Sequence, residues 1–183
     1  MTVQTRKKIT KLAAEELFAY AVKLLSIRAN SSEDLRAKLK RKAAVPADAD
    51  TTIQRLLDIG YLNDHRYAEN YAAARKDNDG FGKFRVLMDL RRKRVGSELA
   101  QNTVEDVFEG TNEPDLINQF IERKMGSIAA GGVDDPKKMA AAYRRLRRAG
   151  FSSGLVIDAL KRYAARPDEL EEPPAEEEEE IED

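Results

Sequence analysis

The single histidine of the chain lies beside two carboxylates. His65 and Glu69 are four residues apart, and Asp64 directly precedes the histidine. Residues four apart share one face of a helix, so this trio could begin a metal site or an acid–base pair. A metal site needs more ligands, however, and polar residues in a first helical turn are usually a solvated helix start. We therefore predict no metal site here.

Other catalytic chemistry has little to build on. Without cysteine and with one histidine, neither a Cys–His pair nor a convincing Ser–His–Asp set can be assembled. The segment "GFGKF" (80–84) places two glycines before a lysine, but it lacks the preceding strand, the glycine spacing and the Ser/Thr of a phosphate loop. We predict that the protein is not an enzyme and uses no cofactor.

Arginine and lysine gather in two segments of similar sequence, "LRRKRVGS" (90–97) and "LRRAGFSS" (146–153). Arginine forms bidentate contacts with phosphate and carboxylate groups, so repeated basic helices could bind a polyanion or an acidic protein surface. The alternative is that these side chains only keep helix faces solvated. We favour binding, because the clusters recur at equivalent positions. The predicted contact residues are Lys38, Arg41, Lys42, Lys83, Arg85, Arg91, Arg92, Lys93, Arg94, Arg144, Arg145, Arg147 and Arg148.

The net charge of −1 conceals a strong asymmetry along the chain. Residues 167–183 hold 11 of the 33 acidic residues and none of the 32 lysines and arginines, so the remainder has 32 positive against 22 negative charges. A basic body with an acidic tail indicates a polyanionic or acidic partner. The tail has almost nothing to bury, which predicts disorder. One hypothesis is that it folds back on the basic residues as an electrostatic brake; a solubilising tail, or an acidic contact for another partner, is the alternative.

Composition also bears on location. The absence of cysteine is typical of a reducing compartment. No uncharged stretch exceeds nine residues, whereas a membrane span needs about 18 or more apolar ones. We expect a cytoplasmic protein that does not contact a membrane.

Apolar residues recur with helical spacing almost throughout, and no segment alternates as a strand would. A leucine in each of three second helices (Leu39, Leu90, Leu146) is followed fourteen residues later by an apolar residue of a third helix. Each is also followed, after five or six residues, by an apolar turn residue: Val45, Val95 and Phe151. This pattern predicts an all-α fold of three tandem three-helix repeats, forming an elongated, curved, solenoid-like body. The predicted ranges are 11–60, 64–109 and 114–165, followed by the disordered tail 167–183.

Some local details can also be predicted. Ser31, with Asp34 three residues later, is expected to be the N-cap of the second helix of the first repeat. In the second helix of the second repeat, Phe84, Leu87 and Met88, or Leu90, are expected to face inward. The glycine-rich segment 126–136 is expected to be a flexible joint. The aromatic residues Tyr67, Tyr71, Phe81 and Phe84 could stack on bases, but their spacing fits core packing better.

The run "GYLNDHRYAENYAAARKDNDGFGKFRVLMDLRRKRV" (60–95) resembles the RecX family of recombination regulators. The family pattern has Gly-Tyr-Leu-Asp-Asp, an Arg-Phe/Tyr-Ala step, and a glycine before a basic helix that ends Leu-x-x-Lys-Gly-Ile. The matching residues are Gly60, Tyr61, Leu62, Asp64, Arg66, Tyr67, Ala68, Gly82, Arg85 and Leu90. With weaker flanks, the resemblance covers about residues 24–163.

This resemblance implies three tandem three-helix repeats and a regulator that binds the RecA filament on DNA, and so inhibits or modulates strand exchange and ATP hydrolysis. Its expected partners are the RecA filament and single- or double-stranded DNA, directly or through the filament, and the protein is expected to be a monomer. The alternative is a general nucleic-acid-binding helical repeat protein without a RecA role. Three features depart from the family pattern: Asn63 replaces an aspartate, Arg94 replaces the glycine before Val95, so that the helix could end differently there, and the acidic tail is additional.

Overall fold

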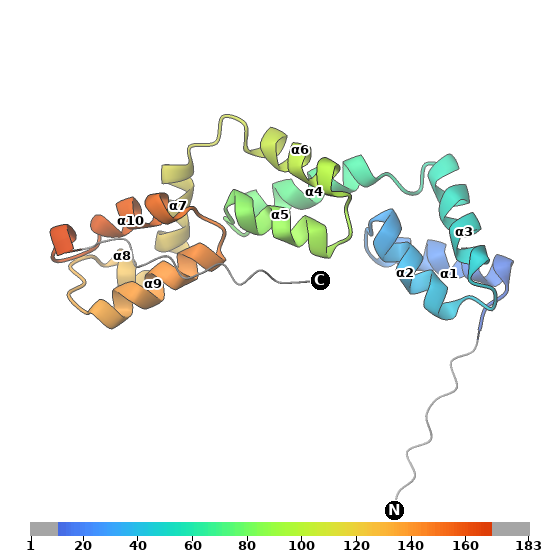
Figure 1. The fold of residues 1–183 in the computed structure, drawn as a ribbon, viewed down its shortest axis with the longest axis horizontal. Coiled ribbons are helices and arrows are strands. Elements are labelled where there is room, and N and C mark those ends of the chain that lie inside the picture. Colours follow the sequence, from blue (N-terminus) through green and yellow to red (C-terminus); the bar gives the residue numbers. More distant parts are fainter. Residues whose placement is uncertain (1–10, 170–183) are drawn as a thin grey trace, which may run out of the picture. The chain divides into compact units, whose positions relative to one another are not determined.

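The computed structural model describes residues 11–169, in which all regular structure is helical apart from two isolated β-bridges (Figure 1). The predicted all-α fold class is confirmed. The chain divides into two compact units, which we call unit 1 (residues 1–71 and 89–103) and unit 2 (residues 72–88 and 104–183). The acidic segment 170–183, predicted to be disordered, lies outside the described residues.

Unit 1 is built on three helices that enclose a leucine-rich core. The helices are α1 (Ala14–Ile27), α2 (Ser32–Lys42) and α3 (Ala47–Asp58). Leu35 and Leu39, four residues apart on α2, are fully buried with Leu17 of α1 and Leu56 of α3. Each such side chain contributes roughly 1.5–3 kcal/mol through burial. A bridge between Leu12 and Ala43 joins the segment before α1 to the end of α2.

Three middle helices contribute residues to both units: α4 (Asp64–Asp77), α5 (Lys83–Arg92) and α6 (Ser97–Phe108). Val86 and Leu90 share one face of α5 and are fully buried. Phe84 and Met88 lie on the other side of α5, with 60% and 40% of their surface exposed. The prediction that Phe84 faces inward was wrong. Of the two alternatives Met88 and Leu90, Leu90 is the one that faces inward, together with Val86.

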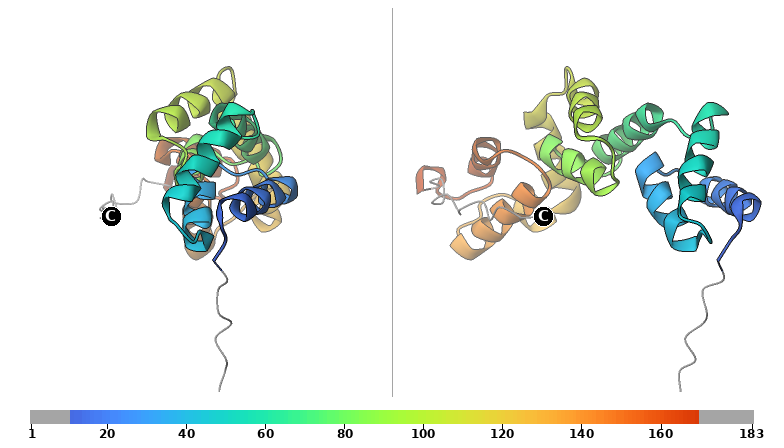
Figure 2. Two further views of the ribbon diagram at one scale, coloured as in Figure 1. Left: turned by 90° about the vertical axis from the view of Figure 1, so that its right-hand side faces the viewer. Right: turned by 45° about the vertical axis from the view of Figure 1, so that its right-hand side comes forward.

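Unit 2 is completed by four further α-helices. They are α7 (Glu113–Lys124), the short α8 (Gly126–Ala129), α9 (Pro136–Arg148) and α10 (Ser153–Lys161), followed by a 3-10 turn, η1 (Pro167–Glu169). In Figures 1 and 2, α9 (orange) and α10 (red) lie beside each other, and their apolar faces share one core with α7. The predicted anchor Leu146 is fully buried in that core.

Two local predictions need correction. The expected flexible joint 126–136 contains α8, whose Ile128 is buried, and Val133 forms a bridge with Ala164, so the segment is tied to the core by backbone and side chains. Val45, predicted to be an apolar turn residue equivalent to Val95 and Phe151, is 54% exposed, whereas Val95 and Phe151 are buried, so the three turns are not equivalent in packing.

Across residues 11–169, every helix is too short or too polar to span a bilayer.

Candidate functional site

The basic residues of α2 are largely engaged with neighbouring carboxylates. The Nζ atom of Lys38 lies 2.7 Å from Asp34 Oδ2, one helical turn away. Arg36 and Lys40 lie 3.0 and 3.2 Å from the carboxylate of Asp50 on α3. Most of the positive charge on this helix is therefore neutralised within unit 1.

Other basic residues of unit 1 are more available. Within residues 11–169, the side chains of Arg41, Lys42, Arg91, Lys93 and Arg94 form no ion pair. Arg92 lies 3.8 Å from the buried carboxylate of Asp89, a distance at which the attraction is weak. All six of these residues were predicted contact residues. Arg41, Arg91, Arg92 and Arg94 are exposed, and Lys42 and Lys93 are partly exposed.

Arg94 ends α5 in a left-handed conformation, with φ of +59°. The N–H of Val95 donates to the carbonyl of Leu90 at 3.1 Å, and the N–H of Arg94 donates to Arg91 at 2.8 Å. This pair of bonds is a Schellman motif, the usual end of a helix whose next residue is glycine. Arginine thus takes the glycine conformation, and the expectation that the helix ends differently here was wrong.

The N-terminus of α2 is held by the end of α5 and the start of α4, in what we call the serine junction. Ser31 Oγ donates to the carbonyl of Lys93 and accepts from the N–H of Asp34 at 3.1 Å, which confirms Ser31 as the predicted N-cap. The N–H and hydroxyl of Ser32 both donate to the Asp64 carboxylate, the former at 2.7 Å. A carboxylate at a helix N-terminus is favoured by the unpaired N–H groups and the helix dipole.

Helix α4 begins at Asp64, as predicted, and its N-cap is the preceding residue, Asn63. The N–H of Arg66 donates to Asn63 Oδ1 at 2.9 Å, so Asn63 takes the capping role. Asp64 is thereby free to bind Ser32, which lies 32 residues earlier. The replacement of an aspartate by Asn63 costs little here, because asparagine and aspartate cap helices about equally well.

Tyr67 lies half-buried near the serine junction, one turn into α4. Its ring stacks on that of Tyr71, with centroids 5.9 Å apart. Burial, reinforced by Tyr71 and the carboxylate of Asp34, raises the pKa of the Tyr67 phenol from 10 to about 12, although the Arg28 guanidinium opposes the shift. The phenol is therefore a neutral group of unit 1 at ordinary pH.

Lys83 and Arg85 of unit 2 are already engaged. Lys83 Nζ lies 2.9 Å from the carboxylate of Glu113 at the start of α7. The guanidinium of Arg85 lies 5.3 Å from the centroid of the Phe81 ring, and its Nη1 donates to the carbonyl of Arg148 at 3.4 Å. Both residues thus tie α5 to its neighbours in unit 2.

The start of α5 and the end of α9 meet through two glycines, in what we call the glycine junction. The N–H of Gly82 donates to Ala149 at 2.9 Å, and the N–H of Phe84 donates to Gly150 at 3.3 Å. A methyl group at Gly82 would lie 2.4 Å from the Gly150 carbonyl oxygen, and one at Gly150 would lie 2.3 Å from the backbone nitrogen of Arg85. Only glycine allows so close an approach, so the "GFGKF" segment is a packing element and its Gly82 holds no phosphate.

Three arginines of α9 are available cations of unit 2. Arg144, Arg145 and Arg148 are exposed and form no ion pair within residues 11–169. Arg147, also exposed, donates from Nη1 to the carbonyl of Phe151 at 2.8 Å and so closes the end of its own helix. Leu146, between them in sequence, is fully buried, which turns the arginines outward.

The aromatic residues divide between core and surface. Phe81 and Phe151 both pack against Phe120, with centroid distances of 6.4 and 5.9 Å, and all three belong to the core of unit 2. The prediction that the aromatic residues pack in a core holds for Phe81, which is partly buried against the core of unit 2. Phe84, in contrast, is exposed and does not pack in the core.

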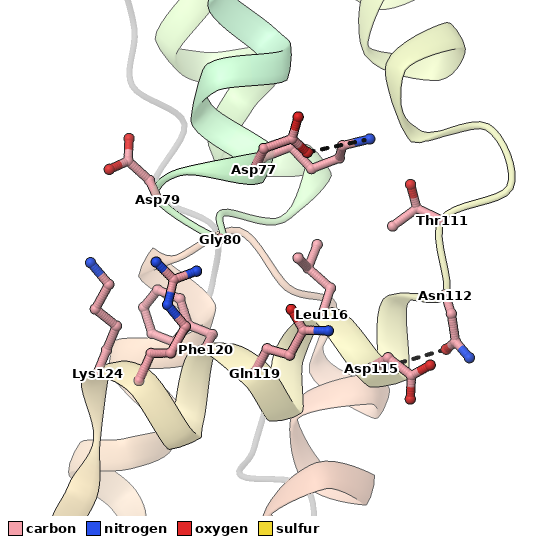
Figure 3. A pocket seen from close by; sticks show the side chains of 12 residues that line it. Asp77, Asp79, Gly80, Thr111, Asn112, Asp115, Leu116, Gln119, Phe120 and Lys124 are labelled. Carbon is pink, nitrogen blue, oxygen red and sulfur yellow. Dashed lines mark hydrogen bonds and ion pairs between the residues drawn. The ribbon is translucent and has the colours of Figure 1, made fainter.

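Two further candidate sites lack the chemistry they would need. No group of three His, Cys, Asp or Glu side chains between residues 11 and 169 is arranged to hold a metal ion. His65 and Glu69 are exposed, while the Asp64 carboxylate is taken up by Ser32. The open depression between α4 and α7 in unit 2, with a volume of about 430 Å³, is drawn in Figure 3. Lysine, arginine and aspartate side chains of opposite charge all line the depression, and Arg123 donates a hydrogen bond to the Asn78 carbonyl at 3.3 Å. The depression therefore offers no set of convergent catalytic groups.

Sequence reasoning found the basic clusters but missed both helix-end junctions. The signal for the glycine junction was the position of Gly150, four residues after Leu146, as Arg94 stands four residues after Leu90. That spacing indicates a left-handed residue at the end of a helix. It does not indicate the contact with Gly82, which lies 68 residues earlier in the sequence. The signal for the serine junction was Asp64, which was interpreted as a local helix start.

Comparison with known proteins agrees with this arrangement. A model of the second three-helix domain of RecX matches residues 63–104. The "Regulatory protein RecX" of Deinococcus radiodurans is 31% identical over 169 residues, which cover 91% of this chain and 78% of the relative. That of Amycolatopsis mediterranei is 29% identical over 138 residues, covering 75% and 77% of the two chains.

Solved structures share the fold. The crystal structure of RecX from Lactobacillus salivarius superposes with a TM-score of 0.65 at 17% identity, covering 80% of this chain and 93% of that one. A second crystal structure of a regulatory protein RecX gives a TM-score of 0.61 at 19% identity, covering 81% and 73%. The two crystal structures show the shared fold, and the 31% identity with the Deinococcus radiodurans relative, over most of both chains, shows common family membership. This protein therefore belongs to the RecX family of regulatory proteins.

Proposed function

We propose that the protein regulates the RecA recombinase by binding the RecA–DNA filament, and thereby inhibits or modulates strand exchange and ATP hydrolysis. The observation that carries this proposal is its membership of a family whose members are named regulatory proteins, over 91% of the chain. RecA as the partner comes from the resemblance to that family. The relatives are named as regulators rather than as enzymes, which supports a role without catalysis.

The surface chemistry supports a polyanionic or acidic partner. Arg91 and Arg94 in unit 1, and Arg144, Arg145 and Arg148 in unit 2, are exposed cations without an ion pair among residues 11–169. Guanidinium groups bind phosphate or carboxylate in bidentate fashion. A filament presents the same acidic surface many times, so two basic groups carried by one chain can bind it together more tightly than either alone. Binding along a filament needs no second copy of the chain, and we propose that a monomer acts in the cytoplasm, where RecA and DNA are found.

The predicted contact residues differ in their availability. Lys38, Lys83 and Arg85 serve internal contacts, so we propose that they support the fold more than they bind a partner. The main contact residues in this proposal are Arg41, Arg91, Arg94, Arg144, Arg145 and Arg148, with Lys42, Arg92, Lys93 and Arg147 at the margins. This division can be tested by substitution.

The test is RecA-catalysed ATP hydrolysis on single-stranded DNA, titrated with this protein at modest salt. We expect a change in the hydrolysis rate at micromolar concentrations, weakened in a variant in which Arg91, Arg94, Arg144, Arg145 and Arg148 are all replaced by glutamine. A control variant with Lys23, Lys124 and Lys161 replaced by glutamine alters exposed cations on α1, α7 and α10 and should behave as the original protein does. A rate that stays constant at micromolar protein would overturn the proposal.

The alternative, general nucleic-acid binding without a RecA role, predicts a different balance of affinities. Free DNA would then bind tightly, and its affinity would fall by orders of magnitude over a few-fold rise in salt. Co-sedimentation with RecA filaments, compared at matched salt with RecA alone and with DNA alone, separates the two. Binding to the filament that greatly exceeds binding to free DNA favours the RecA role, and equal binding favours the alternative.

A further inference from the structure

Helix α9 carries the densest positive charge that is not balanced locally. Its sequence, PKKMAAAYRRLRR, has two lysines and four arginines and no acidic residue. Met139, Ala142 and Leu146 form the buried stripe, and all six basic residues are exposed. In unit 1, by comparison, the cations of α2 have Asp34 and Asp50 within ion-pair distance.

The outer face of α9 is also shaped for an extended chain. Exposed alanines at 140 and 141 separate the lysine pair 137–138 from the arginines Arg144, Arg145 and Arg148. These small side chains leave the helix surface low between two groups of cations. An extended acidic segment could therefore lie along the helix and meet both groups.

The chain itself supplies such a segment next to this helix. The N–H of Ala165 donates to Val133 at 3.0 Å, and the guanidinium of Arg166 lies 2.7 Å from the carboxylate of Asp134. Asp135, the next residue, caps α9. The described backbone therefore passes beside the N-terminal end of α9 at residues 165–166, a few residues before position 170.

The length and charge of residues 170–183 fit the face they would cover. Nine of these fourteen residues are glutamate or aspartate, and five are the consecutive glutamates 176–180. Fourteen extended residues span up to about 46–50 Å, whereas a helix of 13 residues is about 20 Å long. The segment can reach the arginines at the far end of α9 even if part of it turns back.

We infer that residues 170–183 dock along the exposed basic face of α9 and compete there with the polyanion or acidic surface that the arginines would otherwise bind. The contact is electrostatic, so it weakens as salt rises. A tethered segment at an effective concentration of roughly 1 mM, with an intrinsic dissociation constant of roughly 0.1 mM, weakens a competitor about tenfold. The contact itself does not depend on the proposed function, but its regulatory effect rests on it.

Other cations of unit 2 are less suited to this role. Lys83 pairs with Glu113, and Arg85 is bonded to Arg148 and packed on Phe81. Arg166 pairs with Asp134. Helix α9 has six basic residues and no acidic one, whereas α7 and α10 of the same unit both contain acidic residues.

A spin-label measurement on the full chain tests the contact directly. Because the sequence has no cysteine, Ile181→Cys places a single nitroxide in the acidic segment without changing its charge. At low salt we expect the amide NMR signals of residues 137–148 to be broadened much more than those of α1, and the broadening to disappear near 1 M salt. No selective broadening of α9, or selective broadening of residues 91–94 instead, would overturn the inference.

Matched substitutions show whether the arginines are responsible. In the labelled chain, Arg144→Gln, Arg145→Gln and Arg148→Gln together should abolish the broadening. The control, Lys23→Gln, Lys124→Gln and Lys161→Gln, removes the same charge and should retain it. Equal loss in both variants would mean that only the net charge acts, and would overturn docking at α9.

Binding of a fluorescent oligo-dT strand tests the competition. Replacing the five glutamates 176–180 by glutamine should tighten binding about tenfold at low salt and have little effect at high salt. If the spin label reports docking and oligo-dT affinity is unchanged, competition is overturned while docking stands. If oligo-dT does not bind even the neutralised chain, DNA contact in the proposed function is overturned, and the spin-label result still decides the docking.

Discussion

Each end of α5 contacts the end of another helix, and the two contacts use different chemistry. At the glycine junction, backbone meets backbone, and Gly82 and Gly150 leave no room for a side chain. At the serine junction, side chains from Ser31, Ser32 and Asp64 bridge the gap between helix ends. Arg94 takes the left-handed conformation that glycine has at residue 150. At residue 150 the backbone nitrogen of Arg85 would also lie 2.3 Å from an added Cβ, so glycine is required there by space as well as by conformation.

The largest effect is expected at the glycine junction. Gly150→Ala adds a methyl group 2.3 Å from the Arg85 nitrogen, at a residue whose φ is +94°. The left-handed backbone and the overlap together should lower the free energy of unfolding by about 2–5 kcal/mol. Urea unfolding followed by circular dichroism measures this.

The matched control is Gly154→Ala, in the first turn of α10, where an added methyl group meets nothing within 4 Å. It should leave stability unchanged or slightly raised, because alanine favours helix. Comparable losses in the two variants would show that the close approach of Gly82 and Gly150 does not govern stability.

The serine junction should be weaker but sensitive to a single carboxylate. Asp64→Ala leaves the N–H and hydroxyl of Ser32 without their acceptor, which should cost about 1–3 kcal/mol of unfolding free energy. Glu69→Ala removes an exposed carboxylate from the same helix and should cost much less. A loss from Asp64→Ala as small as that from Glu69→Ala would mean that the junction contributes little.

Arg94 sharpens the comparison because the two expected effects have opposite signs. Arg94→Gly relieves the strain of the left-handed backbone at φ of +59°, but glycine also gives the unfolded chain more conformational freedom. The net result should be a rise in the free energy of unfolding of up to about 1 kcal/mol. Arg91→Gly, three residues earlier within the helix, should lose about 1 kcal/mol. Both variants remove one exposed arginine, so net charge cannot explain a difference between them, and losses in both would contradict the glycine-like role of residue 94.

The limits of the sequence follow from the same two junctions. Helices, the buried leucines 39, 90 and 146, and the Ser31 cap could be predicted, because each leaves a signal within a few residues. The inward face of α5 was assigned only in part: Leu90 was named as an alternative to Met88, but Phe84 was preferred to Val86. Both pairs are hydrophobic, and only the packing of neighbouring helices decides between the two stripes. The basic residues were located by type, but their availability depends on carboxylates such as Asp50 and Glu113, which come from other helices. No local pattern in the sequence reports those distances.

The smallest expected effect is a loss of stability at alkaline pH through Tyr67, which lies near the serine junction and not near the glycine junction. Burial raises the pKa of Tyr67, near the serine junction, to about 12, from 10 in an unfolded chain. The folded state therefore favours the neutral phenol, so this stability is full below pH 10 and is lost as pH rises from 10 towards 12. Tyr67→Phe cannot ionise, and unfolding free energies measured by urea at pH 8 and pH 11 should fall less in this variant than in the original protein. Ultraviolet absorbance of tyrosinate should show one fewer late-titrating group in the variant. Equal losses of stability in the two proteins would show that the phenol near Asp34 and Asp64 ionises without strain, and that the serine junction tolerates charge on its aromatic neighbour.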